Sequence, residues 1–290
     1  MQKVAVVTGA NSGIGKACVE LLLKEKISVV GLVRDEPKKE KLLNDMHAFI
    51  SKEASLDVVV GDLKDNSSAK DASLSLKEVI DQKYQGTLDI LMNIAGVVTS
   101  GYHENEDGNE RTFQINHLGP FIVTYYMTPL LRKSKDPRVL VVSSLSHYRA
   151  SINWKNIQNK KFYNILKAYK RSKLYNVFFV KGYAHKIKDV PIFAIDPGLV
   201  QTDIGQKNTS KLAAFVWNLR KKGGTDVYYP AKFMIDVSTK PDYKTLSGHY
   251  IKKGESIKSN PITYDQTHRD RLFDYSETCT HISYDELIKT

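Results

Sequence analysis

The chain has 290 residues, of which 41% are hydrophobic and 10% aromatic, a composition typical of an ordinary globular protein. Lys and Arg exceed Asp and Glu to give a net charge of +11, but the basic residues lie in short scattered clusters, so we expect no nucleic-acid binding and at most peripheral contact with a membrane. No run approaches the roughly 18 apolar residues of a membrane-spanning helix, no signal segment precedes the first strand, and two cysteines form no disulfide framework, which together predict a cytoplasmic protein.

The first predicted elements are a strand, a glycine-rich turn and a helix. The apolar run Val4–Val7 predicts the strand, and apolar residues at helical spacing from Ile14 to Leu22 predict the helix. Glycines between them let the backbone turn tightly and approach a pyrophosphate, whose charge then lies at a helix N-terminus. Such a turn also occurs where a backbone merely packs closely. The dinucleotide-binding residues expected here are Gly9, Asn11, Ser12, Gly13, Ile14 and Gly15.

The second predicted strand, Ser28–Val33, ends in residues that discriminate between nicotinamide cofactors. An NAD enzyme usually places Asp or Glu there to accept from the ribose 2′-hydroxyl, whereas the 2′-phosphate of NADP needs cationic donors. Arg34 falls at the turn and Lys16 follows the last glycine, while Asp35 comes one residue later. We therefore expect NADP(H) to be favoured over NAD(H), with Arg34 as a cofactor-binding residue.

Further strands are predicted at Leu56–Val60, Leu88–Met92 and Arg138–Val142, and a long helix before Arg132. Ser143 and Ser144 directly follow the last of these strands. A hydroxyl at this place can donate to a substrate carbonyl oxygen and stabilise developing negative charge. Both serines are candidates for that role, although a serine at a strand end is often only a turn former.

A second long helix is expected from about Tyr163 to Lys186, and it carries Tyr169 and Lys173 four residues apart on one face. A phenol ordinarily has a pKa near about 10, and a nearby ammonium lowers it toward neutrality. We therefore expect Tyr169 to act as a general acid tuned by Lys173, a function typically contributing about 10²–10⁴ in rate.

Two segments interrupt the alternation of strands and helices, at residues 145–165 and at residues 200–224, which follow a sixth predicted strand, Pro191–Ile195. Long insertions at the carboxyl ends of strands are where such sheets bind ligands. An apolar patch at 212–217 is equally consistent with a helix packed on the core and with a mobile lid over a lipophilic substrate.

With a last strand at Gly248–Ile251, the alternation predicts an α/β fold: one Rossmann-type, doubly wound parallel sheet of about seven strands with helices on both faces. No repeat or linker divides the chain. We expect residues 1–290 to form a single NAD(P)-binding domain with substrate-binding insertions near 145–165 and 200–224.

The turn Thr8–Gly15 and the pair Tyr169 and Lys173 together resemble the short-chain dehydrogenase/reductase (SDR) family, marked by TGxxxGxG and YxxxK motifs. The resemblance covers about Lys3 to Glu277. It is strongest to the retinol dehydrogenase-like branch, through the segments Asn116–Gly119, Ser143–His147, Phe162–Asn164, Ser247–Tyr250 and Leu272–Glu277. Asp196 replaces a histidine common in that branch, and we expect no N-terminal membrane anchor of the kind that many members carry.

The resemblance implies a catalytic set of Asn116, Ser144, Tyr169 and Lys173. The asparagine would bend its helix and hold a water in a proton relay behind the lysine, which would also hold the nicotinamide ribose. Ser144 is favoured over Ser143 for orienting the substrate. His117 would be a bystander, since the matching position in the family is not catalytic.

The same resemblance implies further cofactor contacts. Asp62 and Leu63 would meet the adenine, although an Asp at this place could instead cap a helix. Ile94 stands where the family usually has a second asparagine, which makes part of the hydrogen bonding around the sheet uncertain. The cofactor-binding residues implied are Asp62, Leu63, Asn93, Ala95, Gly96, Tyr169, Lys173, Pro197, Gly198, Val200 and Thr202.

These features predict an NADP(H)-dependent oxidoreductase that interconverts an aldehyde or ketone and an alcohol on a lipophilic substrate. The branch acts on retinoids, steroids, fatty aldehydes and xenobiotic carbonyls, so the resemblance leaves the substrate open. We expect no metal site. Two alternatives stay open: a non-catalytic NADP-binding sensor or interaction protein, and a carbon–carbon double-bond reductase on the same scaffold. A homodimer is compatible with the family and undecided by the sequence.

Overall fold

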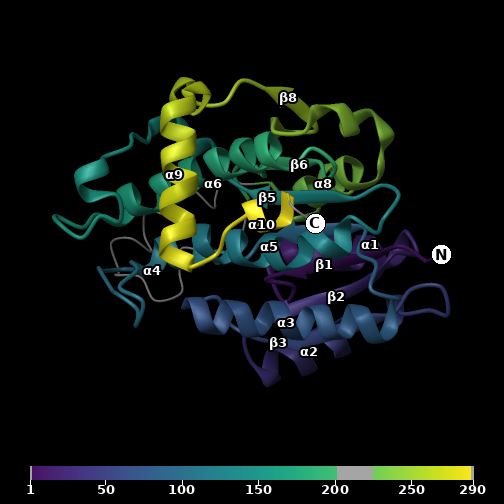
Figure 1. The fold of residues 1–290 in the computed structure, drawn as a ribbon. Coiled ribbons are helices and arrows are strands. Elements are labelled where there is room, and N and C mark those ends of the chain that lie inside the picture. Colours follow the sequence, from purple (N-terminus) through teal and green to yellow (C-terminus); the bar gives the residue numbers. More distant parts are fainter. Residues whose placement is uncertain (1, 201–224, 289–290) are drawn as a thin grey trace.

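A computed structural model describes residues 2–200 and 225–288. They contain one eight-stranded sheet with the order β3-β2-β1-β4-β5-β6-β7-β8 (Figure 1). The first seven strands are parallel, and β8 is antiparallel to β7. The strands are β1 (Val4–Thr8), β2 (Ser28–Val33), β3 (Leu56–Val60), β4 (Ile90–Asn93), β5 (Arg138–Val142), β6 (Ile192–Asp196), β7 (Tyr250–Lys252) and β8 (Glu255–Ile257).

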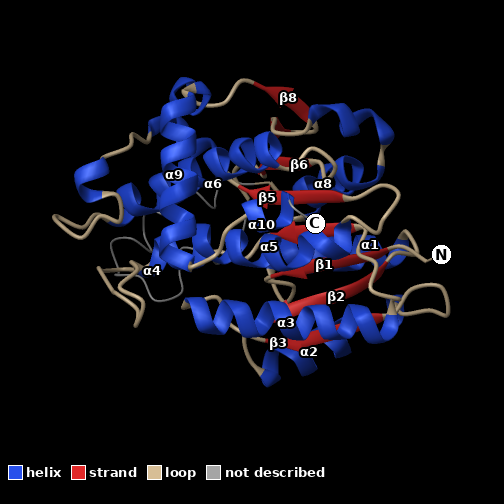
Figure 2. Ribbon diagram, viewed as in Figure 1, coloured by secondary structure: helices blue, strands red, loops and turns tan. Residues whose placement is uncertain are grey.

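Helices cover both faces of this sheet (Figure 2). One apolar core lies between the sheet and α3, α5, α6 and α9, and a second lies between the sheet and α1, α2 and α8. The helices are α1 (Gly13–Lys24), α2 (Glu36–Met46), α3 (Asn66–Lys83), α4 (Arg111–Phe113), α5 (Gly119–Leu131), α6 (Ile165–Lys186), α8 (Tyr228–Thr239), α9 (Gln266–Thr280) and α10 (Asp285–Ile288).

The strands read as continuous apolar runs because helices bury them on both faces. All the residues of β1, β2 and β5 are buried, including Arg138 at the start of β5. Side-chain carboxylates and amides begin several helices: Asp35 caps α2, Asp65 caps α3 and Asn164 caps α6 by accepting from backbone N–H groups. In the described ranges, no helix combines the length and the apolar character needed to cross a bilayer.

The predicted α/β fold with a doubly wound sheet is confirmed, and one edge of the sheet is corrected. The prediction of about seven parallel strands missed β8, which makes the sheet mixed. Lys253 and Gly254 form the tight turn between β7 and β8, with φ of 53° and 83°. Two consecutive left-handed residues match the twist of a hairpin, but Lys-Gly is a weaker sequence signal for such a turn than Asn-Gly or Asp-Gly.

Candidate active site

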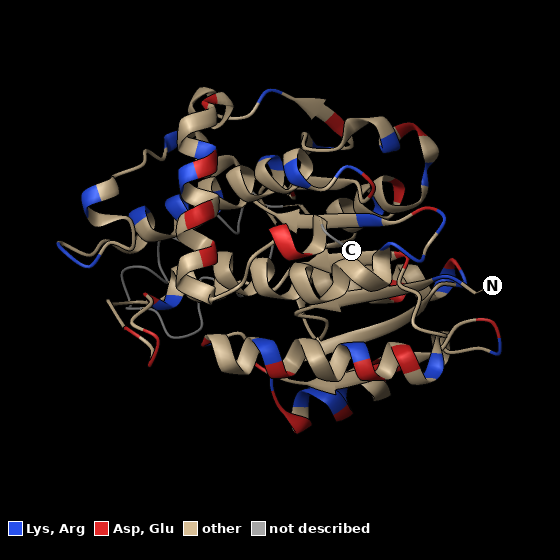
Figure 3. Cartoon of the chain, viewed as in Figure 1, with Lys and Arg blue, Asp and Glu red and all other residues tan. Residues whose placement is uncertain are grey.

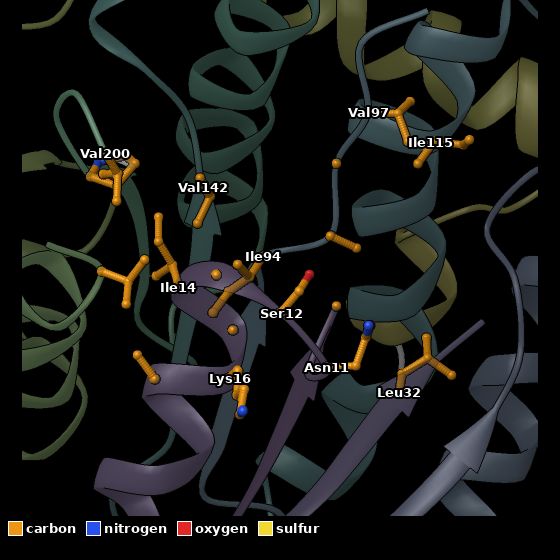
Figure 4. A pocket seen from close by; sticks show the side chains of 18 of the residues that line it. Asn11, Ser12, Ile14, Lys16, Leu32, Ile94, Val97, Ile115, Val142 and Val200 are labelled. Atoms are coloured by element: carbon orange, nitrogen blue, oxygen red, sulfur yellow. The ribbon is translucent and has the colours of Figure 1, made fainter. Parts of the chain in front are cut away.

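A cavity of about 690 Å³ lies at the carboxyl ends of the strands, where the residues following β1 to β6 come together (Figure 4). This is the place where open α/β sheets bind ligands. Of the expected cofactor-binding residues, Asn93 does not line the cavity and Thr202 lies outside the described residues. The others do: Gly9, Asn11, Ser12, Gly13, Ile14, Gly15, Arg34, Asp62, Leu63, Ala95, Gly96, Tyr169, Lys173, Pro197, Gly198 and Val200.

The turn between β1 and α1 forms one wall by close approach of backbone to backbone. A Cβ atom added at Gly15 would lie 2.3 Å from the carbonyl oxygen of Gly9, and Gly9 itself has a φ of 70°. Ser12 is the N-cap residue of α1, and its side chain makes no hydrogen bond to the helix. The first backbone N–H groups of α1 can therefore donate to a ligand. These features fit a pyrophosphate at the helix N-terminus.

Cations line the cavity beside the end of β2. Arg34 is exposed, and both Lys38 and Lys16 also line the cavity. Asp35 accepts a hydrogen bond from the Lys38 backbone N–H at 3.1 Å and forms an ion pair with the ammonium group of the same residue. These interactions, led by the side-chain hydrogen bond, lower the pKa of the Asp35 carboxyl. Asp35 is therefore occupied as a helix cap.

Asp62 and Leu63 follow β3 and lie in the cavity wall. The Asp62 carboxylate accepts from the Leu63 backbone N–H at 2.7 Å. The residue that caps the next helix is Asp65, which accepts from the Ser68 N–H at 2.7 Å. The reading of Asp62 as a plain helix cap is therefore excluded by the geometry.

The segment after β4 is held by Thr8 at the end of β1. The Thr8 hydroxyl accepts from the backbone N–H groups of Ile94 at 3.0 Å and Ala95 at 3.1 Å. The segment after β4 is therefore hydrogen-bonded to the end of β1 even though Ile94 carries no polar side chain. Asn93 points away from the cavity and donates to the Thr124 hydroxyl on α5 at 3.0 Å. Its side chain therefore does not line the cavity, whereas the family resemblance implied that Asn93 contacts the cofactor.

Asn116 lies in one turn of π-helix, Gln114–Leu118, between α4 and α5. The distortion that the resemblance implied is present at the asparagine itself. Its side chain is fully buried: Oδ1 accepts from the Val97 N–H at 2.7 Å, and Nδ2 donates to the Val97 carbonyl at 2.9 Å and to the Ser172 hydroxyl at 3.1 Å. Asn116 thus clamps the cavity wall at Val97 to α6 from behind.

The geometry separates the two serines after β5. The Ser143 hydroxyl is buried and donates to the Lys173 carbonyl at 2.8 Å. The Ser144 hydroxyl, on a half-buried residue that lines the cavity, accepts from the Ser146 N–H at 3.2 Å. Because the Ser144 hydroxyl acts as an acceptor here, its proton can be donated to a ligand. The Ser143 hydroxyl proton is already donated to the Lys173 carbonyl.

Tyr169 and Lys173 share the cavity-facing side of α6. The Lys173 ammonium lies 5.7 Å from the centre of the Tyr169 ring and donates to the Val142 carbonyl at 3.0 Å. Burial lowers the pKa of Lys173 to about 8, because desolvation penalises its charged form. A buried cation beside a phenol is the arrangement that favours the phenolate.

A buried polar chain behind Lys173 was missed by the sequence reasoning. The His117 ring donates from Nδ1 to the Asn176 carbonyl oxygen at 3.3 Å, and its Nε2 faces the Ser276 hydroxyl at 2.8 Å. Asn176 donates in turn to the Val142 carbonyl at 3.1 Å, the same oxygen that Lys173 uses. Burial lowers the pKa of His117 to about 3, so the ring is neutral. The sequence contained one indication of this chain: His117, Asn176 and Ser276 each lie in or beside a segment that resembles the family.

Asp196, which stands where a histidine is common in the branch, is buried at the end of β6. Its carboxylate accepts from the Tyr250 hydroxyl at 2.8 Å and from the Gly198 N–H at 2.9 Å. The His147 ring lies 4.5 Å from the Tyr250 ring and donates from Nδ1 to the Ser144 carbonyl at 2.8 Å. Segments far apart in sequence therefore join to hold the loops on both sides of the cavity.

The two insertions differ in what can be described. Residues 201–224 lie outside the described residues, and so does the apolar patch at 212–217. Within 145–165, Ser146 lines the cavity, and Tyr163 bonds through its hydroxyl to Thr99, another lining residue, at 2.9 Å. Across residues 2–200 and 225–288, no cluster of His, Cys, Asp and Glu side chains is placed to hold a metal ion.

Comparison with known proteins places this geometry in context. The model of the short chain dehydrogenase family matches residues 3–213. Retinol dehydrogenase 14 of Mus musculus is 29% identical over 97% of this chain and 86% of its own. Retinol dehydrogenase 12 of Bos taurus is 30% identical over 94% of this chain and 85% of its own. An uncharacterized protein from Mycobacterium Paratuberculosis has a similar fold, with a TM-score of 0.70 and 24% identity over 98% of this chain and 95% of its own.

Proposed function

The chain belongs to the short-chain dehydrogenase family, and we propose that it interconverts a carbonyl group and an alcohol on a lipophilic substrate with NADP(H). The observation that carries the proposal is the convergence of Ser144, Tyr169 and Lys173 on the cavity whose opposite wall is the glycine turn. The family and its retinol dehydrogenase relatives make the chain an oxidoreductase.

The proposed chemistry uses two hydroxyl groups on one oxygen atom. A bound nicotinamide supplies or accepts the hydride. In the reductive direction, the Ser144 hydroxyl donates a hydrogen bond to the carbonyl oxygen, and the Tyr169 hydroxyl transfers its proton to that oxygen as the alcohol forms. The Lys173 ammonium stabilises the phenolate left behind. Asn116 bonds to both Val97 and Ser172 of α6, which holds the cavity wall at Val97 against the helix that carries Tyr169 and Lys173.

The preference for NADP(H) is proposed from the charges at the end of β2. Arg34 supplies a cationic donor for a 2′-phosphate, beside Lys38 and Lys16, which form ion pairs with Asp35 and Asp45. Asp35 is engaged as the cap of α2 instead of facing a ribose hydroxyl. Arg34→Ala should raise KM for NADPH much more than KM for NADH. Equal losses for both cofactors contradict the preference.

The lipophilic substrate class is proposed from apolar side chains that line the same cavity as Ser144, among them Val97, Val98 and Leu199, and from the names of the retinol dehydrogenase relatives. The first measurement is NADPH absorbance, with NADH in parallel, against retinal, medium-chain aldehydes, ketosteroids and quinones. Product analysis distinguishes reduction of a carbonyl from reduction of a carbon–carbon double bond.

The decisive variant is Tyr169→Phe, with Tyr229→Phe on the exposed face of α8 as its matched control. We expect Tyr169→Phe to lower kcat by at least about 10²–10⁴ while NADPH binds as before, because only the transferable proton is lost. Tyr229→Phe should leave turnover unchanged. Retained turnover in Tyr169→Phe rejects the acid assignment, and NADPH binding without turnover by the wild type across the panel favours a sensor.

A further inference from the structure

One stretch of the sequence carries positive charge without any acid. Between Asp136 and Asp189 there is no Asp or Glu, while Lys and Arg occur twelve times. Residues 149–170, a part of this stretch with many exposed side chains, are called here the basic lobe. Figure 3 shows the lobe projecting beyond α9, with blue Lys and Arg positions and no red ones.

The charges of the lobe are mostly not neutralised by the protein. Lys160 pairs with Glu104 at 2.9 Å. The remaining exposed cations of the lobe have no ion pair with any described residue; they are Arg149, Lys155, Lys161 and Lys167. This arrangement concentrates a positive potential on one side of the molecule.

An aromatic side chain protrudes from the same surface. Phe162 is 96% exposed, between Lys161 and Tyr163, and its φ of 54° is left-handed. A bulky residue rarely adopts this conformation, and an exposed ring recovers none of the hydrophobic free energy that burial would give. Both costs disfavour this conformation of Phe162 in the isolated chain. The exposed ring therefore indicates contact with a partner outside the protein.

The lobe is a built surface. The guanidinium of buried Arg171 donates to the Ser151 and Asn156 carbonyls, each at 3.0 Å, and to the Asn159 side chain at 2.6 Å. On its other side, the Trp154 ring packs beneath the Arg271 guanidinium of α9, 4.3 Å away. Phe162 is thus presented on a fixed scaffold.

We propose that the basic lobe docks on an anionic lipid bilayer, with Phe162 entering the interface and the surrounding lysines facing the lipid phosphates and carboxylates. An aromatic ring flanked by cations matches this boundary, where rings insert between headgroups and each cation gains from the negative surface potential. The lobe projects instead of forming a groove, and it presents one exposed aromatic ring, whereas single-stranded nucleic acids are bound along a groove by several stacking rings.

Docking in this way also orients the cavity. Phe162 lies just before α6, which begins at Ile165 and carries Tyr169 on its second turn. Tyr163, the next residue, bonds to Thr99 in the cavity wall. The surface that would touch the bilayer is therefore continuous with the wall of the candidate active site. The docking itself does not depend on the proposed function.

The test is sedimentation of the full chain, without substrate or cofactor, with vesicles of phosphatidylcholine alone and of phosphatidylcholine mixed with phosphatidylserine. We expect binding to the anionic vesicles only, weakened by salt. Lys161→Gln with Lys167→Gln should lower the partition coefficient about 25-fold, since each cation near the surface contributes about fivefold. Phe162→Ala should lower it about tenfold, through the lost apolar contact.

The matched control is Lys52→Gln with Lys70→Gln, which removes the same charge from exposed lysines outside the lobe. Its effect should stay below about twofold, because charges farther than a Debye length of about 10 Å are screened. Absence of binding to anionic vesicles overturns the proposal, and so do equal losses in the control. Binding that is unchanged in Phe162→Ala and is abolished by an RNA oligonucleotide identifies a general polyanion site and also overturns it.

Discussion

The two walls of the cavity are held in place by different interactions. At the turn between β1 and α1, backbone packs directly on backbone, and Gly15 leaves no room for even a Cβ atom. The opposite wall is held by buried side chains. Three of them, Asn116, Lys173 and Asn176, each donate a hydrogen bond to a backbone carbonyl group of a neighbouring segment.

This difference determines how each wall responds to substitution. In a wall formed by backbone, a substitution acts by steric overlap, and the resulting loss of binding is large and does not depend on pH. A wall built from buried polar groups fails when one partner is removed or changes its protonation state, because the remaining donor or acceptor is left without a bond. The glycine wall should therefore show the largest losses, and the polar wall should show graded losses that include a pH dependence.

The largest effect is expected at the glycine wall. Gly15→Ala places a methyl group 2.3 Å from the Gly9 carbonyl oxygen, so the turn must move. We expect NADPH affinity to fall by about 100-fold, in line with the cost of an ångström-scale misplacement, and the melting temperature to drop. Gly101→Ala is the control, because its nearest neighbour would be His103 at 3.7 Å, an ordinary contact. Calorimetric titration with NADPH measures both; equal affinities would show that the turn yields easily.

The glycine wall is also the part that the sequence predicted best. Only one residue type satisfies a backbone position without room for a side chain, so the motif itself carries the geometry. The sheet was predicted for a similar reason, since strands buried on both faces must be apolar runs. The β8 strand was missed because it is short and exposed at an edge, where neither constraint acts.

The polar wall was predicted only in outline. Tyr169 and Lys173 were found because their spacing places them on one helical face, but the choice between Ser143 and Ser144 rested on resemblance. The structure separates these serines by a long-range bond from Ser143 to the Lys173 carbonyl. His117 and Ser276 lie 159 positions apart and meet only through the packing of α9, which no local pattern encodes.

The next effect concerns the clamp at Asn116. Asn116→Ala removes three hydrogen bonds and leaves the N–H of half-buried Val97 without its partner, which should destabilise the fold by about 1–3 kcal/mol. We expect kcat to fall by about 100-fold with a smaller change in NADPH affinity, because the displaced wall faces the reacting groups. Asn116→Asp keeps the acceptor for the Val97 N–H but sets a buried carboxylate oxygen against the Val97 carbonyl, so it should not recover the stability. Denaturant unfolding and steady-state kinetics test both; an unchanged kcat in Asn116→Ala would mean that the clamp is only structural.

The smallest predicted effect is a pH dependence that belongs to the polar wall. The pKa of His117 is about 3 in the folded chain because the ring is desolvated, whereas an unfolded histidine titrates near about 6.5. The folded state therefore binds fewer protons than the unfolded state between these values, so stability is fully present above about pH 6.5 and falls as the pH is lowered. By pH 5 the loss from this one group is about 2 kcal/mol.

His117→Gln isolates that contribution, since glutamine keeps hydrogen-bonding capacity but does not titrate. The variant should be less stable than the wild type at pH 7, because its amide cannot reproduce both ring contacts, to Asn176 and Ser276. Between pH 7 and pH 5 it should lose about 2 kcal/mol less than the wild type, as measured by urea unfolding. His185→Gln, at an exposed position near the end of α6, is the control and should follow the wild type. If His117→Gln and the wild type lose stability in parallel, the ring takes up its proton without unfolding, and the polar wall is less rigid than its hydrogen bonds imply.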